Sequence, residues 1–298
     1  MPSDDLFVVF NPGSGKGRGS RLVGPVLEAL GAETAHGLTT AAGDEMRLTA
    51  EALARGFRRI VAVGGDGTWS NVGNAIIRSG VDAALGLVPA GTGCDLAKSV
   101  GVPARDVARC AAIAREGHSR RIDVGRIEDR YFLNVAGFGF DIAVIEDSWT
   151  VKHLGGDLLY LFCALRQLHR FPGFPVSIAL DGEPPARGEM LMLVVANARV
   201  FGGGFKIAPG AALDDGRLDV VSFANMTLGR RLSIMGRLLR GTHDGAPEVR
   251  SRRAARVVLT FDGPPAYETD GEWHRAASAQ LGIESIPGAL RVLVPREG

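Results

Sequence analysis

The chain has 298 residues, of which 46% are hydrophobic and 22% are charged. The length suits two domains of about 150 residues each. The proportion of hydrophobic residues excludes a wholly disordered protein. Lys and Arg number 34 against 33 Asp and Glu, so the overall charge gives no case for nucleic-acid binding. Three widely spaced cysteines exclude a disulfide framework and a CxxC metal site.

Membrane insertion is not expected from the sequence. The N-terminus lacks the basic region that precedes the apolar core of a signal peptide. The longest apolar stretch, near Leu158–Leu168, is interrupted by Arg166 and is too short to span a bilayer. We therefore expect a cytoplasmic protein that touches a membrane at most from one side.

Strands and helices alternate over residues 1–121. Three short apolar runs predict strands that each end in a glycine-rich loop: Leu6–Phe10, Arg59–Val63 and Ala84–Val88. Helical patterns follow the first two strands, over Val23–Leu30 and Trp69–Arg78, with one more helix from Asp44 to Gly56. This alternation predicts a parallel sheet with helices on both faces. Ligands bind beyond the carboxyl ends of such strands, which is the edge where all three glycine loops lie.

The pattern changes from Ile122 onward. Short strand-like runs separated by turns predict an antiparallel sandwich or barrel, interrupted by helices near Leu154–His169 and Leu228–Arg240. The expected strands are Ile122–Ile127, Tyr131–Val135, Val176–Leu180, Met190–Val195, Leu218–Phe223, Arg256–Phe261 and Leu290–Val294. We place the two domains at residues 1–121 and 122–298.

The first loop, Asn11–Lys16, does not match a Walker A motif. That motif needs a glycine where Phe10 stands and a Ser or Thr where Gly17 stands. The remaining feature is a strand followed by backbone N–H groups that suit an anionic group.

The second loop, Gly64–Thr68, opens a helix whose N-terminus favours anions. Asp66 is unusual there, because a carboxylate beside a phosphate is repulsive unless a cation or a proton transfer is involved. A helix-capping Asp is the structural alternative. The third loop, Pro89–Gly93, repeats the strand–glycine–Thr arrangement on the next strand, so we interpret the loops together as a phosphate site.

With the second and third loops at this spacing, the sequence resembles the diacylglycerol kinase catalytic-domain family. This family contains bacterial soluble lipid kinases and the sphingosine and ceramide kinases. NAD kinases and phosphofructokinases share GGDGT-type loops, but further motifs occur in family order over nearly the whole chain. They are Asn11–Gly15, Gly64–Thr68, Pro89–Gly101, Phe132–Asp141, Phe201–Pro209, Asp214–Val221 and Asp270–Glu272.

The resemblance implies ATP-dependent phosphorylation of a lipid hydroxyl. It also implies a Rossmann-like nucleotide domain, a β-sandwich domain and an active site in the cleft between them. ATP is then expected at Asn11, Pro12, Gly13, Ser14, Gly15, Thr39, Gly64, Gly65, Asp66, Gly67, Thr68, Trp69, Ser70 and Thr92. The chain departs from the family at Ser70 and Asn71, where Asn and Glu are usual, and at Cys94, where Asn is usual.

Candidate catalytic and metal residues also follow from the resemblance. Glu272 is the implied proton acceptor from the lipid hydroxyl, and Asp66 suits the water shell of the Mg²⁺ that accompanies ATP. Asp215 is the implied ligand of a structural Mg²⁺, with main-chain carbonyls of Ala212 and Arg217. In Asp270–Glu272 a glycine spaces two carboxylates onto one side of a turn. Without the other motifs, this segment would be interpreted as a surface turn.

A basic segment gives the second half an uneven charge. Residues 217–256 hold nine arginines against three acids, and leucines recur at helical spacing over Thr227–Arg240. One interpretation is a basic amphipathic helix at an anionic membrane surface. The other is a helix that packs its leucines on the sandwich and leaves Arg230, Arg231, Arg237 and Arg240 in solvent.

The lipid is left open by the sequence. We expect diacylglycerol, with phosphatidic acid as product, and retain a sphingoid base, ceramide or phosphatidylglycerol as alternatives. A kinase of a soluble substrate, such as an NAD kinase, and a nucleotide-binding regulatory module without catalysis are the two further hypotheses.

Overall fold

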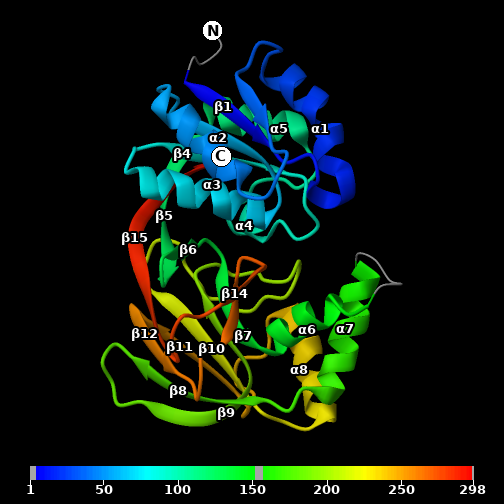
Figure 1. Ribbon diagram of the computed structural model, residues 1–298, viewed down its shortest axis with the longest axis vertical. Helices are drawn as coiled ribbons and strands as arrows, with labels where there is room; N and C mark the ends of the chain where they lie inside the picture. The colour runs from blue at the N-terminus through cyan, green and yellow to red at the C-terminus, as the bar shows by residue number, and fades with distance from the viewer. Residues whose placement is uncertain (1–4, 152–156, 297–298) are drawn as a thin grey trace. The chain divides into compact units, whose positions relative to one another are not determined.

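The computed structural model describes residues 5–151 and 157–296 (Figure 1). The chain divides into two compact units. The first comprises Met1–Val124, Leu213–Asp215 and Ile286–Gly298, and the second comprises Gly125–Ala212 and Gly216–Ser285. The first unit therefore also contains two later segments, Leu213–Asp215 and Ile286–Gly298. A single boundary at residue 121 does not separate the two units.

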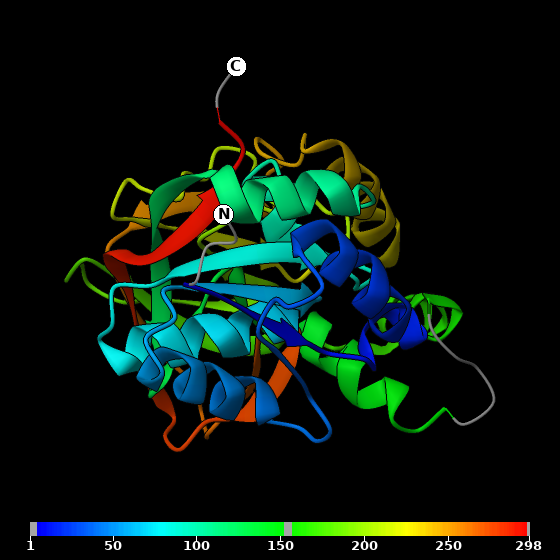
Figure 2. The ribbon, with the colours of Figure 1, turned by 90° about the horizontal axis from the view of Figure 1, so that it is seen from above.

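The first unit is built on a parallel sheet. Its strands pair in the order β4, β3, β1, β2, namely Ala84–Pro89, Arg59–Gly64, Leu6–Phe10 and His36–Leu38. Helices α1 (Ser14–Leu30) and α5 (Val107–Glu116) pack together on one face, and α2 (Asp44–Ala54) and α3 (Asp66–Ser79) on the other (Figure 2). Because both faces are covered, β1 and β4 are buried along their whole length.

The strand order reverses beside β1. The chain moves from β1 outward to β2 and then returns to the other side of β1 to form β3 and β4. This reversal creates a topological switch point at the carboxyl ends of β1 and β3, where α/β sheets bind their ligands. The short helix α4 (Asp95–Ser99) follows β4 at the same edge.

The second unit is mainly antiparallel. Its strands are β6 Arg130–Phe132, β7 Val135–Gly139, β8 Phe174–Leu180, β9 Ala186–Ala196, β10 Leu218–Ala224, β11 Val249–Ala254, β12 Arg256–Thr260, β13 Ala266–Thr269 and β14 Glu272–Arg275. The long strands β5 (His118–Ile127) and β15 (Gln280–Val294) each have residues in both units. Helices α6 (Phe140–Ser148), α7 (Asp157–Arg170) and α8 (Leu228–Arg240) complete the second unit.

Strands β9 and β10 bury side chains on both faces. Leu193 and Val195 of β9 enter one hydrophobic cluster with Phe138 and Tyr267. The alternate residues Met192, Val194 and Ala196 enter a second cluster that includes Ile234 and Leu238 of α8. The two-residue side-chain period of a strand produces this division. It explains why Leu191–Ala196 of β9 are apolar without alternation.

The predicted fold class, an α/β nucleotide domain followed by an antiparallel β-sandwich, is confirmed. The expected strand Tyr131–Val135 is wrong in detail, because β6 ends at Phe132 and β7 begins at Val135. The backbone N–H groups of Leu133 and Asn134 donate to the Asp270 carboxylate, and this replaces continuous strand pairing there. The start of the helix expected from Leu154 lies outside the described residues.

Within the described residues, no helix combines the length and the apolar character needed to cross a membrane.

Candidate functional site

The three glycine loops of the first unit are in direct backbone contact. A Cβ added to Gly91 would lie 2.7 Å from Gly65 Cα, and one added to Gly15 would lie 1.9 Å from the Ala90 carbonyl oxygen. The N–H groups of Ala90 and Gly91 both donate to the carbonyl oxygen of Gly64. Glycine is therefore required because two backbones meet where any side chain would separate the loops.

Asn11 connects the first loop to α2 and α3, which lie on the face of the sheet opposite to α1. Its Nδ2 donates at 3.0 Å both to Glu45 Oε1 near the start of α2 and to Thr68 Oγ1 in the first turn of α3. The Asn11 side chain is thereby held in one orientation at the switch point.

Asp66 binds the N-terminus of α4. Its Oδ1 accepts hydrogen bonds from the backbone N–H groups of Asp95, at 2.8 Å, and Leu96, at 3.1 Å. A capping function was the structural alternative for Asp66, but the helix that it caps is α4 on the neighbouring loop rather than its own helix α3. The carboxylate thus connects the second and third loops.

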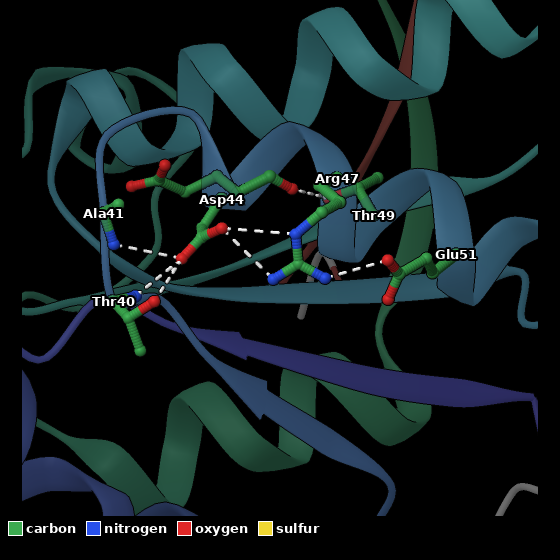
Figure 3. A network of polar contacts seen from close by, with 7 residues as sticks. Thr40, Ala41, Asp44, Arg47, Thr49 and Glu51 are labelled. Atoms are coloured by element: carbon green, nitrogen blue, oxygen red, sulfur yellow. Dashed lines mark hydrogen bonds and ion pairs between the residues drawn. The ribbon is translucent and has the colours of Figure 1, made fainter.

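The segment after β2 is positioned by Asp44 (Figure 3). Asp44 Oδ2 accepts from the backbone N–H groups of Thr40 and Ala41 and from Thr40 Oγ1, and Oδ1 accepts from Arg47. The hydrogen bonds from Thr40 and Ala41 are the main reason that the pKa of Asp44 lies well below its usual range. This network orders the chain next to Thr39, whose own N–H donates to the Phe10 carbonyl.

Some residues predicted for ATP face the protein core. Trp69 is fully buried, and its Nε1 donates to the Ala62 carbonyl of β3 at 3.0 Å. Thr68 and Ser70 are also buried. The first turn of α3 directs the Trp69 indole onto the sheet, which leaves only the backbone of Trp69 for contact with a nucleotide. Thr92 is exposed in the third loop.

Cys94 stands where Asn is usual in the family, and its backbone conformation is one that suits Asn. It has φ 53°, a left-handed conformation that Asn adopts more readily than most residues. The Sγ atom donates to the Gly91 carbonyl at 3.4 Å, which supports the same loop. Burial, followed by the charge of Asp66, raises the pKa of this thiol to about 12, so it stays protonated.

In the second unit, Glu272 follows a two-residue turn between β13 and β14. Asp270 and Gly271 have φ 51° and 89°, as expected for an Asp-Gly hairpin turn. The Asp270 carboxylate is buried and accepts three backbone N–H groups, from Leu133, Asn134 and Val135. The expectation that the turn presents two carboxylates on one side is therefore wrong, because Asp270 is an internal anchor while Glu272 is partly exposed.

Two further buried carboxyl groups, Glu268 and Asp141, lie beside this turn, and the sequence alone predicts no function for either. Glu268 on β13 accepts the Gly271 N–H at 2.6 Å. A Cβ added to Gly137 would lie 1.8 Å from Asp141 Oδ2 and 2.7 Å from Glu268 Oε1, so both oxygens face the same point. Burial is the main cause that raises the pKa of Asp141 to about 7. It also raises the pKa of Glu268 well above its usual value, and the charge of Asp141 adds to this effect.

The raised pKa of Asp141 predicts that the free energy of unfolding depends on pH. Its pKa rises from 3.8 to about 7 on folding, so the folded protein holds a proton that the unfolded chain releases in that range. The free energy of unfolding should therefore fall as pH increases from about 4 to about 7. Asp141→Asn should flatten this fall and raise the free energy of unfolding at pH 8 by more than about 1 kcal/mol.

Urea unfolding of wild type and Asp141→Asn at a series of pH values measures this effect. Asp262→Asn, which removes an exposed carboxylate, is the control and should leave the profile unchanged. Parallel profiles for wild type and Asp141→Asn would contradict the prediction.

The predicted metal residues lie in the turn that leads to β10. Within the described part of the chain, no group of three or more His, Cys, Asp or Glu side chains is placed to hold a metal ion. The donor set of Asp215 with the main-chain carbonyls of Ala212 and Arg217 is all oxygen, which is the kind that Mg²⁺ takes together with water. The neighbouring carbonyl of Leu213 accepts the N–H of Asp123 at 2.6 Å and helps to hold this turn. The residues present therefore fit a hard cation.

Comparison with known proteins agrees with this geometry. Residues 5–127 match the model of the diacylglycerol kinase catalytic domain, and residues 134–294 match the model of the YegS C-terminal NAD kinase beta sandwich-like domain. A "Diacylglycerol kinase" of Mycobacterium tuberculosis is 32% identical over 86% of this chain and 83% of the relative. A "Probable lipid kinase YegS-like" of Pseudomonas aeruginosa is 33% identical over 99% of this chain and 96% of the relative.

Solved structures show the same fold. The crystal structure of a putative diacylglycerol kinase from Bacillus anthracis has a TM-score of 0.79 at 23% identity and covers 98% of this chain and 97% of its own. An NAD kinase from Archaeoglobus fulgidus in complex with ATP has a TM-score of 0.54 at 12% identity, over 97% of this chain and 93% of its own. The two family models and the relatives above 30% identity establish that this chain belongs to the diacylglycerol kinase family of YegS-like proteins.

Proposed function

We propose that this protein is a lipid kinase that transfers the γ-phosphate of ATP to a lipid hydroxyl, with diacylglycerol as substrate and phosphatidic acid as product. The observation that carries the proposal is the direct contact of three glycine loops at the switch point of the first unit. Loops built in this way present backbone N–H groups to phosphate oxygens at close range.

The proposal assigns ATP to the first unit. The loop Asn11–Gly15, Thr39, the backbone of Gly64–Ser70 and Thr92 would hold the nucleotide. Asp66 would hold water molecules of the Mg²⁺ that accompanies ATP, which neutralises charge on the transferred phosphoryl group. Asp215, with the carbonyls of Ala212 and Arg217, would hold a second, structural Mg²⁺.

The proposal assigns the lipid hydroxyl to the second unit. Glu272 would accept the hydroxyl proton as the oxygen attacks the γ-phosphorus, and ADP would leave. Asp270 supports this role through its three hydrogen bonds from Leu133–Val135, because they fix the backbone that carries Glu272.

A soluble-substrate kinase remains the competing function, because an NAD kinase shares the fold. Incubation of the protein with labelled ATP and Mg²⁺ against diacylglycerol, a sphingoid base, ceramide and phosphatidylglycerol in mixed micelles tests the proposal. NAD in buffer without lipid is the parallel assay. Label in phosphatidic acid is the expected result. Label in another lipid alone would correct the substrate, label in NADP would overturn the lipid assignment, and nucleotide binding without transfer to any acceptor would identify a regulatory module.

A further inference from the structure

Helix α8 exposes three of its leucines and packs the fourth, Leu238, in the hydrophobic core. Leu228, Leu232 and Leu239 are 42%, 50% and 53% exposed, whereas Ile234 and Leu238 are buried in the hydrophobic cluster of the second unit. The helix therefore buries one apolar face and leaves a second apolar stripe in solvent. This overturns the interpretation in which the leucine stripe serves only as core.

Helix α7 carries a similar exposed face. Leu161, Phe162 and Leu165 are 56%, 44% and 51% exposed, and their spacing of three and four residues places them along one side of a helix. Of the large hydrophobic side chains exposed elsewhere in the described residues, Leu38 and Val258 lie on separate strands. The exposed apolar side chains are thus concentrated on α7 and α8, which lie side by side in Figure 1.

Arg231 brings the two exposed stripes to the same region. It is buried, and its guanidinium donates to the carbonyls of Leu168 and Phe171 at the C-terminal end of α7 and to that of Met226. Leu228 lies three residues before Arg231 on the same side of the helix, so this flank of α8 faces α7.

Trp149 extends this surface toward the turn that carries Glu272. It is 60% exposed at the end of α6 and makes an edge contact with Trp273, with ring centroids 5.4 Å apart. Trp273 directly follows Glu272 and donates from Nε1 to Glu146 of α6 at 3.1 Å. Tryptophan is the residue that most often marks the boundary between apolar and aqueous phases of a bilayer.

The charges beside the stripes are positive. Arg237 and Arg240 lie in the last turn of α8, and Arg170 ends α7. Two other arginines of α8 are engaged within the protein. Arg231 is buried and donates to main-chain carbonyls, and Arg230 forms an ion pair with Glu248 at 2.7 Å. The net positive charge of these helix ends complements an anionic lipid surface.

We propose that α7, α8 and Trp149 form a docking surface for a bilayer that contains anionic lipid, and that docking brings a bilayer lipid to the turn of Glu272. The delivery of a lipid to Glu272 rests on the proposed lipid-kinase function, whereas the docking surface does not. Apolar side chains of α7 and α8 enter the interfacial region of the bilayer, while Arg237 and Arg240 bind lipid phosphates.

Flotation of the full chain with phosphatidylcholine vesicles, with or without phosphatidylglycerol, tests the surface. The double variant Leu161→Gln/Leu232→Gln should bind both vesicle types at least tenfold more weakly than wild type. The control Leu38→Gln/Val258→Gln removes two exposed apolar side chains elsewhere and should bind as wild type. Arg237→Gln/Arg240→Gln should lose about fivefold per arginine on anionic vesicles alone, whereas the control Arg21→Gln/Arg109→Gln should not.

A second assay separates docking from catalysis. Phosphorylation of a short-chain diacylglycerol below its micellar concentration should be equal in wild type and all four variants. If Leu161→Gln/Leu232→Gln loses vesicle binding while wild type does not phosphorylate the short-chain diacylglycerol, the docking surface is supported and the proposed function is overturned. Unchanged vesicle binding by Leu161→Gln/Leu232→Gln would overturn the surface. A wild-type dimer that this variant converts to a monomer with full vesicle binding would instead identify an interface between copies of the chain.

Discussion

Glu272→Gln is expected to lower the rate of phosphoryl transfer to a lipid hydroxyl by about 10²–10⁴-fold, because it removes the general base and keeps the side-chain shape. The fold should survive, since the turn is held by Asp270 and by the hydrogen bond from Gly271 to Glu268 rather than by Glu272 alone. The affinity for ATP should barely change, because the phosphate loops belong to the first unit. Turnover at saturating ATP and nucleotide binding by calorimetry measure the two effects.

Two variants serve as comparisons for Glu272→Gln. Glu189→Gln removes an exposed carboxylate on β9 and should be fully active. Asp215→Asn should lower thermal stability and weaken the Mg²⁺ dependence, because its proposed metal organises the protein rather than the transferred phosphate. If Glu272→Gln loses ATP binding but keeps turnover at saturating ATP, the assigned role is wrong and Asp66 takes its place as the candidate base.

Asp66→Asn is expected to lower turnover at least about 100-fold while the protein remains folded, because the charge is lost from a preorganised phosphate site. The amide oxygen of Asn can still accept the N–H groups of Asp95 and Leu96, so the cap of α4 is kept. Asp66→Ala removes both functions. It should lose the same activity and in addition about 1 kcal/mol of stability.

Thermal unfolding and Mg²⁺ titrations of turnover on the two Asp66 variants distinguish charge from capping. Near wild-type turnover in Asp66→Asn would show that the carboxylate serves only to hold α4. Equal stability of Asp66→Ala and wild type would contradict the cap. The first outcome would also require another group to interact with Mg²⁺.

Local sequence patterns determined the fold class and the loops. Apolar runs followed by glycine-rich segments predicted β1, β3 and β4, because a parallel strand buried on both faces needs continuous apolar residues. Family motifs in order predicted the family, which the comparisons confirm. The residue-level roles of Asp66, Glu272 and Asp215 stay predictions.

Strands without such a pattern were not predicted. β11, with the sequence VRSRRA, has four exposed residues, and pairing with β10 rather than its own apolar content makes it a strand. The interruption between β6 and β7 likewise depends on Asp270, which is distant in sequence and accepts hydrogen bonds from the backbone there.

Only the tertiary structure decided which polar groups are buried and which apolar groups are exposed. The sequence places Trp69 in a phosphate loop, but its indole packs on the sheet. It places Asp270 beside Glu272, but their environments differ because one carboxylate is enclosed by backbone N–H groups. Leu228, Leu232 and Leu239 of α8 fit a core helix equally well by their spacing. They are exposed because Ile234 and Leu238 already fill the space on the sheet. Burial depends on contacts between distant segments, and helical or strand spacing alone does not contain that information.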